Sequence, residues 1–275
     1  MQTVVFFNTK GGTGKSTTCL ALADLLHASD YRVVIVDSDI AQHSCTNIAP
    51  PINQNSAFPV FAYPELCPVD PATGQRDLTS YAAQIAQRGQ GHDFVLVDLP
   101  AKDAPEALAA IVAADVVIIP SKPGQTDVDA LENETYLELH KALAERKRLD
   151  ATRPLPPVWV VPVAVNTQLN VHKYQVKQTV QVVDGLQKRL EEGSAEFNLP
   201  PLADALIDVV EQGIAISAAA EEMTALKASV GKVMTGKASR EKLAQQLKYL
   251  AEYVGILPRG RAQRRHKSKT KEVLA

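Results

Sequence analysis

Two lysines and three glycines lie close together near the start of the chain, in the segment Lys10-Gly11-Gly12-Thr13-Gly14-Lys15-Ser16-Thr17. Glycines at this density allow successive backbone N–H groups to point at phosphate oxygens, because no side chains block the approach. In such a loop Lys15 reaches the β- and γ-phosphates, and the Ser16 hydroxyl holds Mg²⁺. The segment therefore predicts binding of a nucleoside triphosphate, with a second lysine, Lys10, at the start of the loop.

The residues on either side of this loop provide the context that a phosphate-binding loop requires. The apolar run Val4-Val5-Phe6-Phe7 predicts a buried strand, and residues 16–27 have the pattern of an amphipathic helix. Strand, loop and helix in this order form the arrangement in which the motif binds phosphate. The alternative, a glycine-rich turn with an incidental lysine, does not account for this context.

Acidic residues end two further apolar runs. Val36-Asp37-Ser38-Asp39 closes the second predicted strand, which we expect to lie close to the first, and Phe94-Val95-Leu96-Val97-Asp98 closes a later one. A carboxylate at the first position can orient the attacking water or contact the Mg²⁺ shell, and Asp98 fits a Walker B strand whose acid holds Mg²⁺ through water. Acids at strand ends also cap ordinary loops. The interpretation as a nucleotide site therefore depends on the position of these two acidic strand ends after the glycine-rich loop in the sequence.

Apolar runs alternate with helical stretches along most of the chain, which predicts a parallel sheet built by right-handed crossovers. The fold class is therefore α/β: a P-loop NTPase with a mostly parallel, twisted sheet flanked by helices on both faces. We expect one P-loop domain over residues 1–257 and a basic, disordered tail over residues 258–275. The predicted strands are Thr3–Asn8, Arg32–Asp37, Phe58–Tyr63, Phe94–Leu99, Val116–Pro120 and Val158–Val165.

Three helices are predicted with more detail. One covers Arg76–Arg88, and a long one runs from Asp127 to about Leu149, with acids early and basic residues late, which suits the helix dipole. A third begins near Ser239 and carries an apolar stripe made of Leu243, Leu247, Leu250 and Val254. We expect this stripe to pack on the body of the domain. The alternative is a helix lying on a membrane surface, but the expected lysine-rich polar face and large aromatics are missing.

Composition and charge narrow the class of protein further. Three cysteines without pairing or metal-ligand spacing suggest a reducing compartment, and no apolar run approaches the ~20 residues that span a membrane. We therefore predict a soluble cytoplasmic protein. The net charge of −2 conceals an asymmetry, because residues 259–275 carry seven basic side chains against Glu272 alone, whereas the rest of the chain carries 22 basic and 30 acidic residues. A basic tail on an acidic body is typical of arms that bind polyanions.

Four motifs in order resemble the ParA/MinD family of deviant Walker-A ATPases. The family's K-G-G-x-G-K-[ST] loop is matched by residues 10–17, and its D-x-D strand end by Asp37-Ser38-Asp39. Residues 92–100 resemble its Walker B block, and residues 114–120 resemble its A-D-x-V strand. The resemblance runs from residue 1 to about 130 and more weakly to about 220. The sequence differs from the family pattern after D-x-D, where Ile40-Ala41-Gln42 stands in place of Pro-Gln. Because only nine residues precede Lys10, we do not expect the N-terminal helix-turn-helix of larger family members.

The resemblance implies a role for each matched residue. Lys10 would reach the phosphates of the partner in an ATP-sandwiched dimer, and together with Lys15 and Asp39, which positions the hydrolytic water, it would form the catalytic set. The metal set would be Ser16, Asp39 and Asp98 around Mg²⁺. The ATP-binding set would be Gly11, Gly12, Thr13, Gly14, Lys15, Ser16, Thr17 and, at the adenine, Asn166.

The function that this resemblance implies is a ParA-like ATPase that forms a homodimer on ATP binding and binds DNA without sequence preference. A ParB-like partner would stimulate slow hydrolysis, and the nucleoid-associated dimer would position a plasmid, chromosome or protein cargo. The basic residues that support DNA binding, besides the tail, are Lys227, Lys232, Lys237, Arg240, Lys242 and Lys248.

Three alternatives remain at this point. The first is a MinD-like ATPase associated with the membrane, although the sequence offers no stable membrane anchor. The second is a P-loop ligase or synthetase, and the third is a DNA-binding scaffold in which the nucleotide is structural. Iron–sulfur relatives need cysteine ligands after the Walker B strand, and no cysteine follows Cys67, which excludes them.

Overall fold

The apolar runs form a seven-stranded parallel sheet in the computed structural model, which describes residues 1–39, 45, 59–62, 70, 72–74, 78–101, 105–165, 169–210, 212–214 and 237–258. The strands are β1 Gln2–Phe6, β2 Val33–Asp37, β3 Val60–Ala62, β4 Phe94–Asp98, β5 Val116–Ser121, β6 Val158–Pro162 and β7 Ile207–Val209. Their order across the sheet is β3-β2-β4-β1-β5-β6-β7, and each neighbouring pair is parallel. The α/β fold class with a mostly parallel sheet is confirmed.

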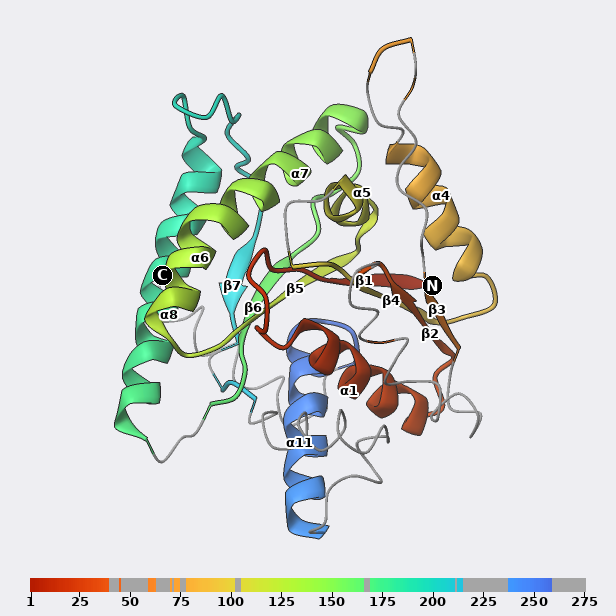
Figure 1. Ribbon diagram of the computed structural model, residues 1–275, viewed down its shortest axis with the longest axis vertical. Coiled ribbons are helices and arrows are strands. Elements are labelled where there is room, and N and C mark those ends of the chain that lie inside the picture. Colours follow the sequence, from red (N-terminus) through yellow and green to blue (C-terminus); the bar gives the residue numbers. More distant parts are fainter. Residues whose placement is uncertain are drawn as a thin grey trace.

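Helices cover both faces of this sheet, as the near-continuous apolar strands require. The helices are α1 Lys15–Ala28, α4 Leu78–Arg88, α5 Pro105–Ala113, α6 Gln125–Ala130, η1 Leu131–Thr135, α7 Tyr136–Leu149, α8 Asn170–Glu192 and α11 Lys237–Tyr253. Figure 1 shows α1 and α11 on one side of the sheet, and α4, α5 and α7 on the other.

Two apolar cores fill the spaces between the sheet and these helix layers. Because side chains alternate along a strand, Val4 and Phe6 of β1 belong to the core that includes Leu22 of α1, whereas Val5 belongs to the core that includes Leu139 of α7. The central strand β1 is therefore held on both faces, and the loop that follows it starts from a rigid support.

The long helix predicted from Asp127 to Leu149 begins at Gln125 and contains a change of geometry. Its middle turn, η1 (Leu131–Thr135), is a π-helix between α6 and α7. Such single π turns widen the helix locally and occur often at functional sites. Within its last turn, Arg146 is buried and donates to Val112 O at 3.1 Å and Pro154 O at 2.6 Å, so it serves tertiary packing more than the helix dipole.

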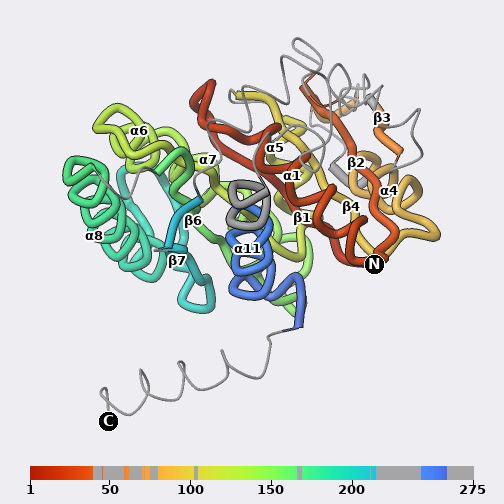
Figure 2. Tube along the Cα trace, turned by 90° about the horizontal axis from the view of Figure 1, so that it is seen from below, coloured from red at the N-terminus to blue at the C-terminus, as the bar shows by residue number. Residues whose placement is uncertain are grey.

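The C-terminal helix packs on the body of the protein, as expected from its apolar stripe. Leu243, Leu247, Leu250 and Val254 are each at most 3% exposed, and all belong to the core beneath α1. Figure 2 shows α11 next to α1 on this side of the sheet. Among the helices in the described part of the chain, none combines the length and the apolar character needed to traverse a bilayer.

Two features of the sheet differ from the sequence-based prediction. β7 and the long helix α8 that precedes it were not predicted, although Ile207 and Val209 alternate with an exposed Asp208 as in a short edge strand. We also expected the second strand to lie close to the first, but β4 lies between β1 and β2. This order places the ends of β2 and β4 next to each other, with Asp37 opposite Asp98 in the register.

The parallel arrangement brings the carboxyl ends of all strands to one edge of the sheet. The glycine-rich loop after β1, the acids that end β2 and β4, and the starts of α6 and α8 after β5 and β6 all lie there. This edge is where open α/β sheets bind their ligands.

Candidate nucleotide site

The loop between β1 and α1 turns through glycines in the left-handed region of backbone conformation. Gly12 has φ of 71° and Gly14 has φ of 92°, and Gly14 immediately precedes the first helical residue, Lys15. A Cβ at Gly14 would lie 3.3 Å from Val163 Cγ2, in the segment after β6. Glycine at position 14 therefore meets both a backbone and a packing requirement.

Lys15 lies almost buried across this loop. The residue is 7% exposed, and its Nζ donates to the backbone oxygen of Lys10 at 3.2 Å. Burial lowers the pKa of Lys15, and the negative charges of Asp98 and Asp39 partly oppose this effect. The ammonium group is thus partly desolvated, with the two predicted carboxylates as its nearest stabilising charges.

Asp98 is a completely buried acid at the end of β4. Burial raises the pKa of its carboxyl to about 7, while hydrogen bonds from the side chains of Ser16 and Cys45 act in the opposite direction. The Cys45 thiol lies 3.2 Å from Asp98 Oδ2, and Oδ1 of Asp98 has no hydrogen-bond partner within the described residues. An acid buried in this way gains from a cation at the oxygen that lacks a partner.

Asp37 and Asp39 complete a row of acids at the same edge. Asp37 is fully buried beside Asp98, and its Oδ1 accepts a hydrogen bond from the Asp39 backbone N–H at 3.2 Å. Asp39 is 9% exposed. Of the two acids, Asp39 is the one whose charge acts on Lys15, whereas Asp37 lies beside Asp98 and holds the Asp39 backbone.

The residues at this edge fit Mg²⁺ held jointly with a nucleotide. Mg²⁺ in nucleotide sites takes one or two carboxylates or hydroxyls, with phosphate oxygens and water supplying the remaining ligands. The Ser16 hydroxyl contacts Asp98, whose Oδ1 is available, and this matches such a set. Within the described part of the chain, no group of three or more His, Cys, Asp and Glu could hold a metal ion without other ligands.

Lys10 is held by the first turn of α6. Its Nζ lies 2.7 Å from Asp127 Oδ2 and 2.7 Å from Thr126 Oγ1. The Lys10 side chain is 30% exposed, whereas that of Asp127 is only 10% exposed. The ammonium of the second lysine therefore contacts a different element of the fold, the start of α6.

A buried polar network ties the start of the loop to the π turn. Thr135 Oγ1 lies 2.8 Å from Thr9 Oγ1 and donates to Asn8 Oδ1 at 3.2 Å, and the same Asn8 oxygen accepts from the Lys10 backbone N–H at 2.9 Å. Asn8 Nδ2 donates to Pro120 O at 2.9 Å. The helix that follows β5 thus holds the Lys10 side chain directly through Asp127 and its backbone indirectly through Thr135 and Asn8.

The structure brings together most of the residues singled out in the sequence. Thr13 is buried with Oγ1 3.5 Å from Lys10 O, and Thr17 is partly buried in the first turn of α1. Asn166 lies outside the described residues, as do the basic tail, Lys227, Lys232 and the side chains of Lys237, Arg240 and Lys242. Lys248 on α11 is exposed.

Sequence reasoning missed the partners of Lys10. Asp127 and Thr135 belong to a helix whose pattern indicates packing, and nothing in their local sequence marks them as neighbours of a loop more than 110 residues away. A small signal was present, since Gln125-Thr126-Asp127 begin a helix and only three residues separate them from the end of β5. Polar residues at that point of a parallel sheet lie at the ligand-binding edge.

Comparison with known families gives a match over the first half of the chain. The family model described as ATPase MipZ matches residues 2–146, which is more than half of the 275 residues. The chromosome-partitioning ATPase Soj of Thermus thermophilus is 29% identical over 171 residues, covering 54% of this chain and 67% of that protein. An uncharacterized protein of Pseudomonas putida is 28% identical over 141 residues, and the match spans only 53% of its length.

Solved structures share the fold over most of the chain. Apo McdA of Cyanothece superposes with a TM-score of 0.58 at 18% identity, covering 90% of this chain and 98% of that one. At this level of identity the likeness is one of fold, which extends past residue 146 to the elements β6, α8 and β7.

Proposed function

The chain belongs to the MipZ family of ATPases, within the ParA/MinD class of deviant Walker-A ATPases, and from this premise we propose that it is a positioning ATPase that switches between monomer and DNA-bound dimer. The observation that carries the proposal is the pair of lysines at one loop with different environments. Lys15 is buried beside Asp98 and Asp39, whereas Lys10 lies at the outer edge on Asp127. Lys15 contacts the nucleotide bound in its own chain, and the Lys10 side chain can release Asp127 and contact a second molecule.

In this proposal ATP and Mg²⁺ are bound by the loop and the acids around it. The backbone of residues 11–14 and Lys15 hold the phosphates, Thr17 contacts the α-phosphate, and Asn166 contacts the adenine. Ser16 and Asp98 hold Mg²⁺, which neutralises charge on the phosphates. Asp39 orients the attacking water, because it follows the end of β2 next to Lys15. MinD of Pyrococcus horikoshii, which shares the fold, is described as a complex with Mg-ADP, and this supports the choice of nucleotide.

Lys10 acts in the dimer. Its ammonium group would leave Asp127 and reach the phosphates bound by the other subunit, where a second cation stabilises the charge that develops during phosphoryl transfer. Hydrolysis would be slow in the dimer alone and faster with a ParB-like partner, because complete assembly of the site then depends on a second protein.

The dimer would bind DNA without sequence preference and thereby associate with the nucleoid. We take residues 1–257 as the ATPase domain and residues 258–275 as a basic arm that contributes to this binding, because its net charge is +6. The name of the relative Soj, a chromosome-partitioning ATPase, supports partition of a DNA or protein cargo. A membrane-bound alternative is less well supported, because the apolar stripe of α11 is buried against the core.

The test measures binding to a random DNA duplex without nucleotide, with ADP and with ATP, for the intact chain and a truncation that ends at Pro258. We expect binding that requires ATP, falls steeply with salt and weakens when the tail is removed. Equal binding in all three nucleotide states would contradict the switch. Absence of DNA binding, with ATP-dependent binding to anionic lipid vesicles, would support the membrane alternative instead.

A further inference from the structure

Thr135, in the π turn η1, is a fully buried polar side chain whose hydroxyl faces the residues before the glycine-rich loop. A threonine hydroxyl has one hydrogen to donate and two lone pairs to accept with. The hydrogen goes to Asn8 Oδ1 at 3.2 Å, and the oxygen contacts the Thr9 N–H at 3.4 Å and Thr9 Oγ1 at 2.8 Å. Because the hydrogen of Thr135 is used on Asn8, the Thr9 hydroxyl donates to Thr135. The whole hydrogen-bonding capacity of this side chain is therefore directed at Asn8 and Thr9.

The Asn8 side chain passes this restraint on to the loop. Its Oδ1 also accepts the Lys10 backbone N–H at 2.9 Å, and its Nδ2 is held by Pro120 O at 2.9 Å. On the other side of the same residue, Lys10 O accepts a hydrogen bond from Lys15 Nζ at 3.2 Å. The backbone on both sides of Lys10 is thus fixed, and the N–H groups of residues 11–14 follow directly from this fixed point.

The π turn is what allows one helix to present both Asp127 and Thr135 to the loop. Thr135 follows Asp127 by eight positions, which in a regular α-helix would place the two side chains about 80° apart around the axis. In the π turn, the Tyr136 N–H bonds Leu131 O, five positions back instead of four. The extra residue in this turn reduces the angle to about 20°. Asp127 therefore reaches the Lys10 ammonium while Thr135 reaches Asn8.

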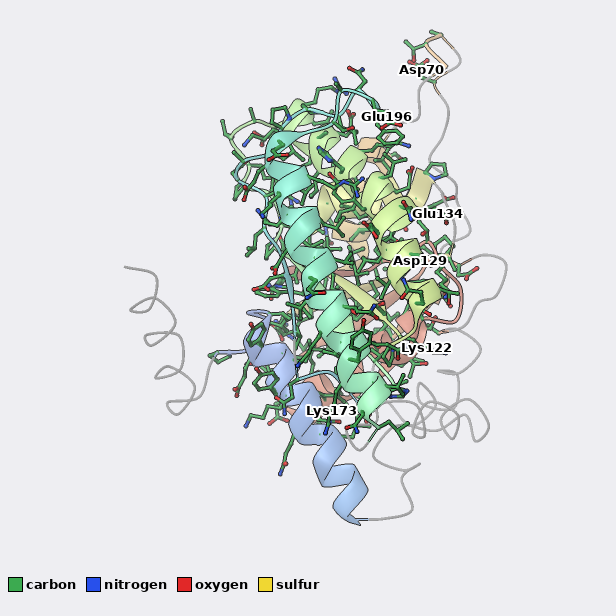
Figure 3. All side chains as sticks on the ribbon, turned by 90° about the vertical axis from the view of Figure 1, so that its left-hand side faces the viewer. Asp70, Lys122, Asp129, Glu134, Lys173 and Glu196 are labelled. Atoms are coloured by element: carbon green, nitrogen blue, oxygen red, sulfur yellow. The ribbon has the colours of Figure 1, made fainter. Side chains whose placement is uncertain are left out.

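The helix α8 holds the π turn in place through Arg189. In a regular α-helix Glu132 O would accept the Tyr136 N–H, which here bonds farther back. Arg189 donates to Glu132 O at 3.0 Å instead, and its guanidinium lies 4.2 Å from the centroid of the Tyr136 ring. Figure 3 shows α8 alongside the helix that carries Glu134, with Lys173 near the end of α8 that extends past the start of α6. The π turn is therefore held by α8 on one side and contacts the residues before the loop on the other.

We propose that Thr135 is a positioning residue for the phosphate-binding loop, oriented by the π turn and held there by Arg189. The inference rests on the proposed nucleotide site and names residues outside the loop that determine its affinity. The Thr135 hydroxyl keeps the Asn8 amide oxygen at the Lys10 N–H, and this orients the loop before a phosphate arrives. A loop that is already ordered loses less conformational freedom when its ligand binds.

The experiment measures binding of a fluorescent ATP analogue with Mg²⁺ by anisotropy, at low protein concentration. Wild type is compared with Thr135→Val, which keeps the shape and removes the hydroxyl, with Thr135→Ser, which keeps the hydroxyl, and with a matched control, Thr179→Val. Thr179 is 2% exposed, and its Oγ1 donates to Gln175 O within α8 at 3.0 Å. We expect Thr135→Val to raise the dissociation constant about tenfold, and Thr135→Ser and the control to stay within about twofold.

Two further measurements separate positioning from stability. In urea denaturation Thr135→Val and Thr179→Val should both be less stable than wild type, because each loses a buried hydrogen bond, but only Thr135→Val should bind nucleotide more weakly. The loss of affinity should be similar for ADP, because the loop binds the α- and β-phosphates that both nucleotides carry.

Arg189→Gln tests the same network from the partly buried side of the π turn, and it serves even where Thr135→Val does not fold. We expect it to weaken nucleotide binding about threefold, because the turn loses the donor to Glu132 O. In the Thr135→Val background the same substitution should change nothing, since Arg189 acts through Thr135. Unchanged binding in Arg189→Gln alone, or a full additional loss in the double variant, would overturn the role of Arg189.

The outcomes distinguish this inference from the proposed function. Wild type that binds neither nucleotide would contradict the proposed function itself. Wild type that binds, with Thr135→Val equal to Thr179→Val or with Thr135→Ser as weak as Thr135→Val, would overturn this inference alone. A loss confined to ATP would also overturn it, because the effect would then lie at the γ-phosphate and not in the loop.

Discussion

The Lys10 ammonium and the Asp127 carboxylate form an ion pair at 2.7 Å between residues 117 positions apart in the sequence. The pair joins the glycine-rich loop to the start of α6, and Thr126 adds a hydroxyl at the same distance. In the free protein, Lys10 is therefore held within its own chain. Any movement of this lysine toward a partner must first break the contact with Asp127.

Substitution of Asp127 should change dimerisation more than folding. In Asp127→Asn the lysine keeps a polar neighbour but loses a buried charge, so release of Lys10 should cost about 1 kcal/mol less in each subunit. ATP-dependent dimerisation, which releases two of these lysines, should therefore strengthen roughly 30-fold. The measurement is the dimer dissociation constant, with Thr126→Ala as a control that keeps the ion pair. A weaker dimer would show that Asp127 acts within the assembled interface rather than as a restraint on Lys10.

The buried acid Asp98 should lower the stability of the nucleotide-free protein at neutral and higher pH. Its folded pKa of about 7 lies above the unfolded value of 3.8, so its neutral form is favoured by the fold. The stability present below pH 3.8 is lost as the pH rises toward 7. Without metal or nucleotide, Asp98→Asn should therefore be more stable than wild type at pH 8, by up to about 4 kcal/mol, and nearly equal at pH 4.

Chemical denaturation across this pH range, in the presence of a chelator, provides the comparison for Asp98. The same variant should bind Mg²⁺-ATP more weakly than wild type, because the oxygen without a partner no longer carries charge. If Asp98→Asn is less stable than wild type at pH 8, other groups of the nucleotide-free protein stabilise the charged Asp98 carboxylate, and the prediction is wrong.

Two glycines of the loop should respond differently to alanine. Gly12 and Gly14 both have positive φ, so a Cβ costs about 1 kcal/mol at either position. At Gly12 the Cβ would meet nothing within 4 Å, but at Gly14 it would lie 3.3 Å from Val163 Cγ2. Gly14→Ala should therefore lose more stability than Gly12→Ala in urea denaturation. Equal losses of stability would mean that Val163, after β6, can move away from the added Cβ without a measurable change in the free energy of unfolding.

His140 should make the protein sensitive to mild acid. The side chain is fully buried, with Nδ1 2.9 Å from the Tyr136 hydroxyl and Nε2 2.8 Å from Pro200 O. Burial lowers its pKa below the usual 6.5, so stability that is present above pH 6.5 is lost as the pH falls through the folded pKa. His140→Gln should be less stable at pH 8 by about 1–3 kcal/mol, because it loses hydrogen bonds.

The pH dependence distinguishes this effect from general acid denaturation. Between pH 7 and pH 5 the stability of His140→Gln should fall less steeply than that of wild type, because the variant has no imidazole to protonate there. Urea midpoints at four pH values measure both slopes. Parallel slopes would show that protonated His140 is tolerated in the fold.

Local sequence determined the elements and the chemistry of the nucleotide site. The apolar strands, the glycines that accept positive φ, Lys15 and the strand-end acids Asp37 and Asp98 were all recognisable, because each depends on short-range periodicity or on side-chain chemistry. The shared edge also followed from the sequence, since parallel strands place their carboxyl ends together.

The tertiary structure decided which of these groups touch. The position of β4 between β1 and β2 places Asp37 beside Asp98, and the π turn brings Thr135 to Asn8 and Thr9. The tertiary structure also brings the Lys10 ammonium to the Asp127 carboxylate and sets how far α8 extends beyond α6. Strand order and helix length relative to a neighbour depend on packing between segments that are distant in the sequence, as the contacts of Lys10 and Thr135 with residues more than 100 positions away illustrate. Such packing leaves no periodic signal along the chain.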